Sequence, residues 1–212
     1  MGYFRGVYER SVSNTKPEEK EPHKRDEAAL AIARGKVYEV FDSLGIPYEV
    51  VSHPPINSVA DRERQGVVVD AVICKNLFLC NKDKNRYYLF TLPLDKRANL
   101  AALQKTLGET RFSFGDEEAL WDMLRVTPGS VSLLNIIGAR DNAPAGDEPR
   151  ASQGETCKKP LMFLIDAETL TLKRIGLHPN DNAATIMFGA DQLPKLLEHY
   201  GAAYEFVDLD AG

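Results

Sequence analysis

The chain has 212 residues, of which 43% are hydrophobic and 27% charged, and its formal net charge is −5. This composition is typical of a globular protein that can bury a full core. The acidic balance excludes a protein that coats nucleic acid over a long footprint, but it is compatible with binding a single end of an RNA. No apolar run is long enough to cross a bilayer, and the charged N-terminus does not resemble a secretory signal.

Hydrophobic periodicity and turn residues divide the chain into a series of expected elements. The first 25 residues are polar and rich in lysine and glutamate, which predicts a mobile extension before a single domain over 26–210. The first half of that domain should contain a helix over 27–44, a strand over 48–51, a short helix capped by Asn57 or Ser58 and ended by Gly66, and a hairpin of strands over 76–80 and 86–92. A helix over 95–107, a brief strand over 111–114 and a helix over 116–124 should follow. The last part should contain a second hairpin of strands over 161–165 and 170–175, a strand over 184–188, a helix over 193–200 and a strand over 204–207.

The order of these elements indicates the fold class. Strands outnumber helices, and hairpins join several neighbouring strands, so we predict an α/β domain with a mixed rather than a purely parallel sheet. Residues 138–160 are polar and rich in glycine and proline, which predicts a long surface loop. The sequence shows no internal repeat.

Cysteine and histidine usage points to a reduced compartment and to no metal centre. The three cysteines are an odd number without CxxC spacing, which favours a cytoplasmic protein with free thiols. Cys74 and Cys80 would lie on one side of a strand, too far apart to form a disulfide. The four histidines are scattered without metal-ligand spacing, so we expect neither a metal nor a cofactor.

Residues 74–80 read CKNLFLC and are typical of the start of a β-strand. A cation beside an amide is costly at that place if it is buried and ordinary if it is solvated. Lys75 and Asn76 therefore either face a ligand with anionic or carbonyl oxygens, or Lys75 discourages pairing at an edge strand. Further basic residues nearby either form a small basic face or simply decorate a hairpin tip and a helix start; they are Lys82, Lys84, Arg86, Lys96 and Arg97.

Two loops are further candidates for a site. Residues 127–132 read TPGSVS, and the backbone N–H groups of Gly129 and Ser130 either line an anion site or belong to a plain turn. Residues 176–182 read GLHPNDN, a loop stiffened by glycine and proline, in which His178 either relays a proton or is bonded within the turn. The asparagines of this loop are typical of left-handed turn positions.

These three stretches, in this order, resemble the YbaK / prolyl-tRNA synthetase-associated editing-domain family, and within it the freestanding ProX- or PrdX-type proteins. The resemblance runs from about Leu30 to Val207. It implies one α/β domain with a mixed, largely antiparallel central sheet and flanking helices. It also implies a cytoplasmic trans-editing hydrolase that cleaves the ester of a mischarged tRNA-Pro, most often one that carries alanine. Residues 138–160 and the first 25 residues depart from the family pattern.

The resemblance assigns roles to individual residues. The family lysine falls on Lys75, which would position the ester through the terminal phosphate or ribose, and the late-loop histidine falls on His178. Together with the backbone donors that could stabilise a developing oxyanion, the expected site comprises Lys75 and His178 as catalytic residues and Asn76, Gly129, Ser130 and Gly176 as substrate-binding residues. No strong general base other than His178 stands out in the sequence. The terminal 2′-hydroxyl of the tRNA is therefore a second candidate for activating water.

Several alternatives stay open at this point. The substrate could carry another small amino acid such as cysteine, or the protein could be a regulator that binds aminoacyl-tRNA or an amino acid without hydrolysis. A nucleophilic Cys74 beside Lys75 is a further possibility, although neighbouring strand residues point to opposite faces and no histidine is placed to assist. The expected partners are the aminoacylated 3′ end of tRNA-Pro and prolyl-tRNA synthetase.

Overall fold

The computed structural model describes residues 27–137 and 161–209. The expected N-terminal extension and the expected loop over 138–160 lie outside these residues. Within the described part, every helix is too short or too polar to pass through a lipid bilayer.

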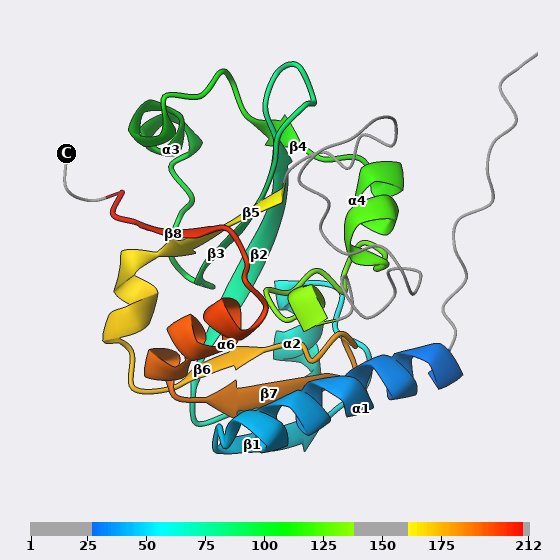
Figure 1. Cartoon of the computed structure of the whole chain (residues 1–212). Helices are drawn as coiled ribbons and strands as arrows, with labels where there is room; N and C mark the ends of the chain where they lie inside the picture. The colour runs from blue at the N-terminus through cyan, green and yellow to red at the C-terminus, as the bar shows by residue number, and fades with distance from the viewer. Residues whose placement is uncertain (1–26, 138–160, 210–212) are drawn as a thin grey trace, which may run out of the picture.

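A single mixed sheet of eight strands organises the chain, with the strand order β1-β7-β6-β2-β3-β5-β8 and with β4 paired to β2 (Figure 1). Four strand pairs are antiparallel and three are parallel, which confirms the predicted mixed sheet. The strands are β1 (Tyr48–Ser52), β2 (Val72–Cys80), β3 (Tyr87–Pro93), β4 (Ser113–Phe114), β5 (Leu161–Asp166), β6 (Ile175–Leu177), β7 (Ala184–Phe188) and β8 (Tyr204–Val207).

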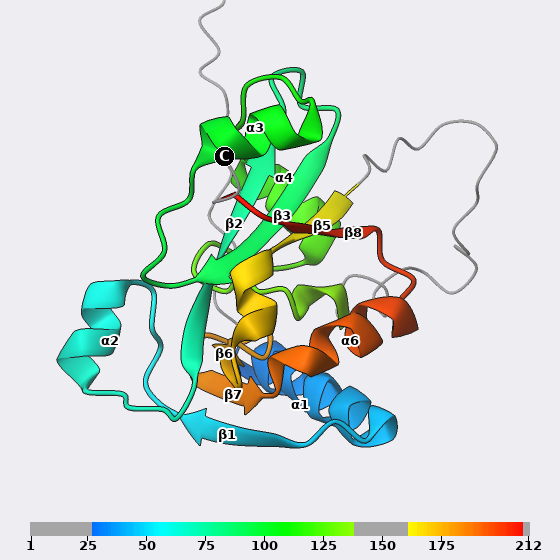
Figure 2. The ribbon, with the colours of Figure 1, turned by 90° about the vertical axis from the view of Figure 1, so that its left-hand side faces the viewer.

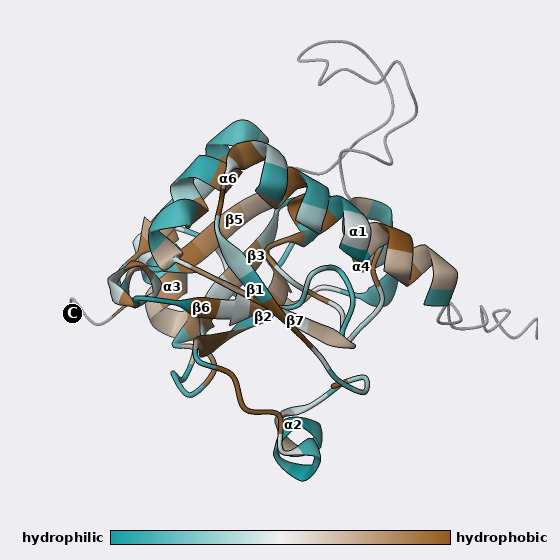
Figure 3. Ribbon diagram, turned by 90° about the horizontal axis from the view of Figure 1, so that it is seen from below, coloured by the Kyte–Doolittle hydropathy of each residue, from teal (hydrophilic) through white to brown (hydrophobic). Residues whose placement is uncertain are grey.

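Helices cover both faces of the sheet and create two hydrophobic cores. On one face α1, α4 and α6 pack against the strands, and α3 packs against the other face, so α3 and α4 lie on opposite sides of the sheet (Figure 1). Seen from below, α1 and α6 are banded with polar and apolar residues, as expected of helices that bury one side (Figure 3). The helices are α1 (Glu27–Leu44), α2 (Val59–Gln65), α3 (Leu100–Leu107), α4 (Glu117–Leu124) and α6 (Leu193–His199), and the 3-10 turns are Ala167–Thr171 and Ala190–Gln192.

The short helix α2 projects away from the body of the molecule (Figures 2 and 3). Its ends are those that the sequence predicts, because the Ser58 side chain accepts from the Asp61 amide and Gly66 takes a left-handed conformation with φ 61°. None of residues 60–65 is buried. The helix therefore depends on a few polar contacts for its position.

One expected hairpin is wrong, and one expected helix begins later than predicted. The strand β5 does not form a hairpin with the segment that follows it; it pairs in parallel with β3 and β8, and the chain crosses through a 3-10 turn to β6, which pairs with β2 and β7. The helix predicted from residue 95 begins at Leu100, after the cap Asn99. In the segment before the cap, the Lys96 ammonium pairs with the buried Asp166 at 2.9 Å, and the carbonyl oxygens of Leu94 and Lys96 accept from Lys75.

Candidate functional site

The sheet register brings Lys75 and His178 together. Strands β2 and β6 are parallel, and Val72 lies opposite Ile175 and Ile73 opposite Gly176. Continuing this register by two residues places Lys75 beside His178, which follows the end of β6. Residues in register on parallel strands point to the same face, so both side chains belong to one face of the sheet.

Gly176 lies on the same face, opposite Ile73 and two residues before His178. A Cβ on Gly176 would lie 2.6 Å from Cδ1 of Ile73 and 3.2 Å from Cγ2 of Thr185. The methyl groups of two neighbouring strands thus fill the space above Gly176. Glycine is required here because of this close approach, and the floor of the site is shallow.

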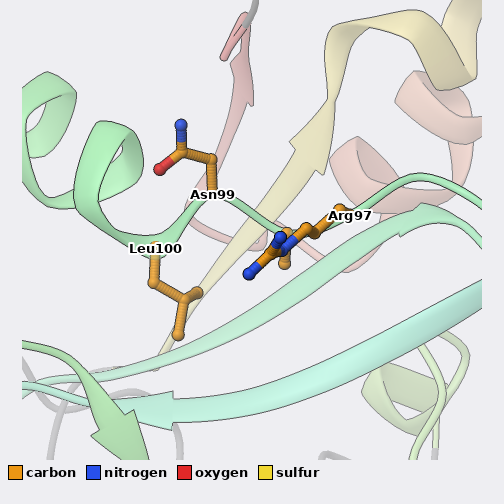
Figure 4. Close-up of a pocket in the computed structure, with 4 residues that line it drawn as sticks. Arg97, Asn99 and Leu100 are labelled. Carbon is orange, nitrogen blue, oxygen red and sulfur yellow. The ribbon is translucent and has the colours of Figure 1, made fainter.

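The Lys75 side chain is held by the loop that follows β3. Its Nζ donates to the carbonyl oxygens of Leu94 at 2.8 Å and of Lys96 at 2.5 Å. An ammonium group has three N–H donors, so two backbone bonds orient Nζ and leave one donor direction for a substrate oxygen. The same loop continues into a pocket of about 530 Å³ at the start of α3, bordered by Arg97, Ala98, Asn99 and Leu100 (Figure 4).

His178 is arranged as a neutral imidazole. Its Nδ1 lies 3.1 Å from the carbonyl oxygen of Ala184. A carbonyl can only accept, so Nδ1 carries the proton and Nε2 keeps a lone pair. Burial lowers the pKa of His178, and the nearby charges of Arg62 and His53 act in the same direction. The ring is therefore neutral at neutral pH and can accept a proton.

The lowered pKa of His178 predicts a specific pH dependence of stability. The unfolded chain binds a proton at His178 near pH 6.5 while the folded chain resists it, so stability is complete above that pH and falls as the pH is lowered through 6.5. Thermal unfolding between pH 5 and 8 should show this loss in the wild type and a smaller loss in His178→Gln. Replacing the exposed His199 with glutamine should leave the wild-type profile unchanged; an identical profile for His178→Gln would contradict the assignment.

Three residues that the sequence analysis did not single out lie beside His178. The ring centroid of His53 is 6.3 Å from that of His178. His53 Nε2 lies 2.9 Å from Oγ1 of Thr185, and Arg62 donates from NH2 to the same hydroxyl at 3.2 Å. The signal available in the sequence was a histidine, His53, directly before Pro54 and Pro55.

The loop over 127–135 packs against the loop that carries His178. Asn135 is fully buried; its Oδ1 accepts from the Ser132 amide at 2.7 Å, and its Nδ2 donates to Oδ1 of Asn180 at 2.9 Å and to the Ser130 carbonyl at 3.3 Å. Asn180 has φ 60°, which agrees with the predicted left-handed turn position. Asn135 thus joins the two candidate loops through one buried amide.

Gly129 and Ser130 lie at this junction. Gly129 has φ 91°, and a Cβ there would lie 2.9 Å from Oδ1 of Asn57. The amide of Ser130 donates to the carbonyl of Thr127 at 3.1 Å. The turn therefore uses the Ser130 donor, and the oxyanion role expected for both residues stays a prediction that depends on releasing that bond.

Asn76 and Lys75 make contacts on different sides of β2. Oδ1 of Asn76 accepts from the Thr91 hydroxyl at 2.8 Å and from the Leu133 amide at 3.1 Å. These bonds fasten the 127–135 loop to the sheet, on the face opposite to Lys75. The substrate contact expected for Asn76 stays a prediction, and its amide nitrogen is the group that could make it.

The structure weakens two further expectations, a nucleophilic Cys74 and a basic face around Lys75. Cys74 is buried, and desolvation, followed by the charge of Asp166, raises its pKa to about 12. A thiol of this kind is protonated at neutral pH and is a poor nucleophile. Three residues of the expected basic face form ion pairs, which weakens that face; the pairs are Lys84–Asp116, Arg86–Glu109 and Lys96–Asp166.

Comparison with known proteins identifies similar chains. The sequence model of one protein family, the aminoacyl-tRNA editing domain, matches residues 53–196. A prolyl-tRNA editing protein, ProX, from Acetoanaerobium sticklandii is 27% identical over 177 residues, which cover 84% of this chain and 98% of that protein. A prolyl-tRNA synthetase associated domain-containing protein from Mus musculus is 28% identical, over 72% of this chain and 82% of its own. A crystal structure provisionally described as a trans-editing enzyme for prolyl tRNA synthetase has the same fold, with a TM-score of 0.55 at 17% identity, over 83% of this chain and 96% of that one.

Proposed function

The chain belongs to the aminoacyl-tRNA editing domain family, and from this membership we propose that it is a trans-editing deacylase that hydrolyses the ester of alanyl-tRNA-Pro. The observation that supports the proposal is the register of β2 and β6, which, continued by two residues, sets Lys75 beside His178 on one face of the sheet. The acylated 3′ end of the tRNA is the substrate, and this places the protein in the cytoplasm. Prolyl-tRNA synthetase is the expected second partner.

The proposed reaction is attack of water on the ester carbonyl. Nε2 of His178, or the neighbouring 2′-oxygen of the ribose, takes a proton from the water as its oxygen bonds to the carbonyl carbon. The tetrahedral intermediate then expels the 3′-oxygen, which takes up a proton and leaves free alanine. An aminoacyl ester is already activated, so positioning and charge stabilisation are sufficient contributions.

Lys75 and the loop at Gly129 supply those contributions. The third N–H of the Lys75 ammonium points at an oxygen of the substrate, while its other two hold the group in place. The backbone N–H groups of Gly129 and Ser130 lie on the loop that Asn135 joins to the His178 loop, and Ser130 would bind the carbonyl oxygen once its bond to Thr127 is released. Asn76 fastens that loop to the sheet through the Leu133 amide and would act on the substrate by positioning the loop.

The floor of the site supports a small amino acid. Methyl groups of Ile73 and Thr185 crowd Gly176, so the space beneath the ester admits a methyl side chain more easily than a larger one. One methylene in such a site is worth about 1–3 kcal/mol of discrimination. Cysteine is therefore a weaker second substrate rather than an excluded one.

The test is release of free amino acid from tRNA-Pro carrying alanine, cysteine or proline. We expect alanine to be released fastest, cysteine more slowly, and proline little above the rate without protein. Fastest release of cysteine would identify a deacylase for that amino acid. Tight binding of all three substrates without release from any would contradict hydrolysis and identify a binding regulator.

A further inference from the structure

The guanidinium of Arg62 is an unneutralised cation beside the proposed site. Arg62 belongs to helix α2, and its NH2 donates to Oγ1 of Thr185 in the sheet. Its NH1 is buried and has no hydrogen-bond partner among residues 27–137 and 161–209, and no carboxylate in that part of the chain forms an ion pair with it. A partly buried arginine normally has an anionic partner, so this arrangement indicates a missing one.

The surroundings of Arg62 fix its direction. His53 Nδ1 faces the carbonyl oxygen of Pro54 at 2.9 Å and therefore carries a proton. Its Nε2 then accepts from the Thr185 hydroxyl, which in turn accepts from Arg62. This chain of hydrogen bonds uses one terminal nitrogen of the guanidinium and leaves the other directed elsewhere.

The register places the residue that Arg62 binds next to the reacting group. Leu177 lies opposite Ile186, so continuing the antiparallel pair of β6 and β7 by one residue sets His178 beside Thr185. Arg62, bonded to Thr185, is consequently a neighbour of His178 and of the face that carries Lys75. A carboxylate also acts on His178, that of Asp181, and it is paired with Arg34 at 2.8 Å.

We propose that Arg62 binds the phosphate that joins the terminal adenosine to the preceding nucleotide of the aminoacyl-tRNA. This inference rests on the proposed function and names a contact for the same substrate. An aminoacyl ester has no carboxylate, so the anion nearest to the ester is the phosphate of the same nucleotide. A guanidinium fork matches phosphate oxygens, and this contact would supply the anion that the protein itself does not provide.

The binding of Arg62 is tested with substrates that differ only in that phosphate. Hydrolysis rates are compared for 3′-alanyl-adenosine and for 3′-alanyl-adenosine 5′-monophosphate, with wild type, Arg62→Gln and Arg62→Lys. We expect the wild type to prefer the phosphate-bearing substrate by about tenfold in kcat/KM, Arg62→Gln to lose this preference, and Arg62→Lys to keep part of it. With full alanyl-tRNA-Pro, Arg62→Gln should also lower the slope of log KM against log salt concentration by about 0.7.

The matched control is Arg64→Gln on the same helix. Arg64 is exposed and pairs with Asp61, so its replacement removes an equal charge without touching Thr185. It should keep the phosphate preference of the wild type. Equal losses on both substrates in Arg62→Gln, with a lowered unfolding temperature, would overturn the proposal in favour of an arginine that only anchors α2.

Binding of the unacylated dinucleotide pCpA separates this inference from the proposed function. If the wild type hydrolyses neither alanyl substrate, the deacylase assignment fails, but about tenfold weaker pCpA binding by Arg62→Gln would still support the phosphate site. Equal pCpA binding by wild type and variant would overturn it. Free alanine could instead compete with the substrate in the wild type but not in Arg62→Gln, while the variant keeps the phosphate preference. That result would show that Arg62 binds a carboxylate and would also overturn the proposal.

Discussion

Replacing Lys75 with methionine is expected to lower kcat/KM for alanyl-tRNA-Pro by about 100- to 1,000-fold, which corresponds to roughly 3–4 kcal/mol of transition-state stabilisation. Methionine keeps the length of the side chain and removes the ammonium. The substrate then loses an oriented donor, and the carbonyl oxygens of Leu94 and Lys96 lose theirs. The loss should fall mainly on kcat if the donor acts on the developing charge.

The stability of the same variant separates a catalytic from a structural role. Loss of two bonds from a charged donor costs about 2 kcal/mol or more, so the variant should unfold at a lower temperature but remain folded at 25 °C. Lys84→Met is the matched control, because Lys84 pairs with Asp116 on the surface and its removal should change neither quantity by much. Undiminished alanine release by folded Lys75→Met would remove Lys75 from the mechanism.

The second large effect is expected at Asn135. Replacing it with alanine leaves the Ser132 amide and the Asn180 oxygen without their partner in a buried place, which costs about 3 kcal/mol of unfolding free energy. The candidate oxyanion loop and the His178 loop also lose their connection. We therefore expect kcat/KM to fall by about tenfold or more, beyond what the unfolded fraction explains.

Urea unfolding and single-turnover hydrolysis of alanyl-tRNA-Pro measure the two parts of this prediction. Asn85→Ala is the control, since Asn85 is an exposed asparagine whose Oδ1 accepts one bond from Asn81. It should cost less than about 1 kcal/mol and leave hydrolysis unchanged. If Asn135→Ala changed the unfolding free energy and the hydrolysis rate as little as Asn85→Ala, the two loops would be held together by other contacts.

Local chemistry made most of the fold predictable. Helix α2 ends where the sequence predicts, at Gly66, which adopts a positive φ, and Gly45 does the same directly after α1. The failures came from long-range pairing. The segment after β5 looked like a hairpin partner, but β5 found parallel partners in β3 and β8, and no local pattern in residues 170–175 specifies that choice.

The candidate site was predictable only in part, for a similar reason. Lys75 and His178 stand out because a cation in an apolar strand and a histidine in a stiff loop are unusual locally. Arg62 and Asn135 do not, because an arginine in a polar helix and an asparagine in a loop are ordinary residues. Their significance arises from contacts with Thr185 and Asn180, more than forty positions away, which only the structure provides.

Lys75 and Asn76 are neighbours in the sequence, but their side chains point to opposite faces of the sheet. Lys75 and Asn76 were expected at one site, yet consecutive strand residues face opposite sides of a sheet. The Asn76 oxygen is bonded to the 127–135 loop, while the Lys75 ammonium lies with the loop after β3. We therefore expect an Asn76 variant to act more on stability and loop position than on direct contact with the ester.

A double-mutant cycle on single-turnover hydrolysis of alanyl-tRNA-Pro asks whether residues 75 and 178 work on the same ester. Wild type, Lys75→Met, His178→Gln and the double variant are compared at saturating protein. If both side chains serve one transition state, the double variant should be scarcely slower than the worse single variant. Losses that multiply, or release that no variant reduces, would mean that these two neighbouring strands do not share a catalytic centre.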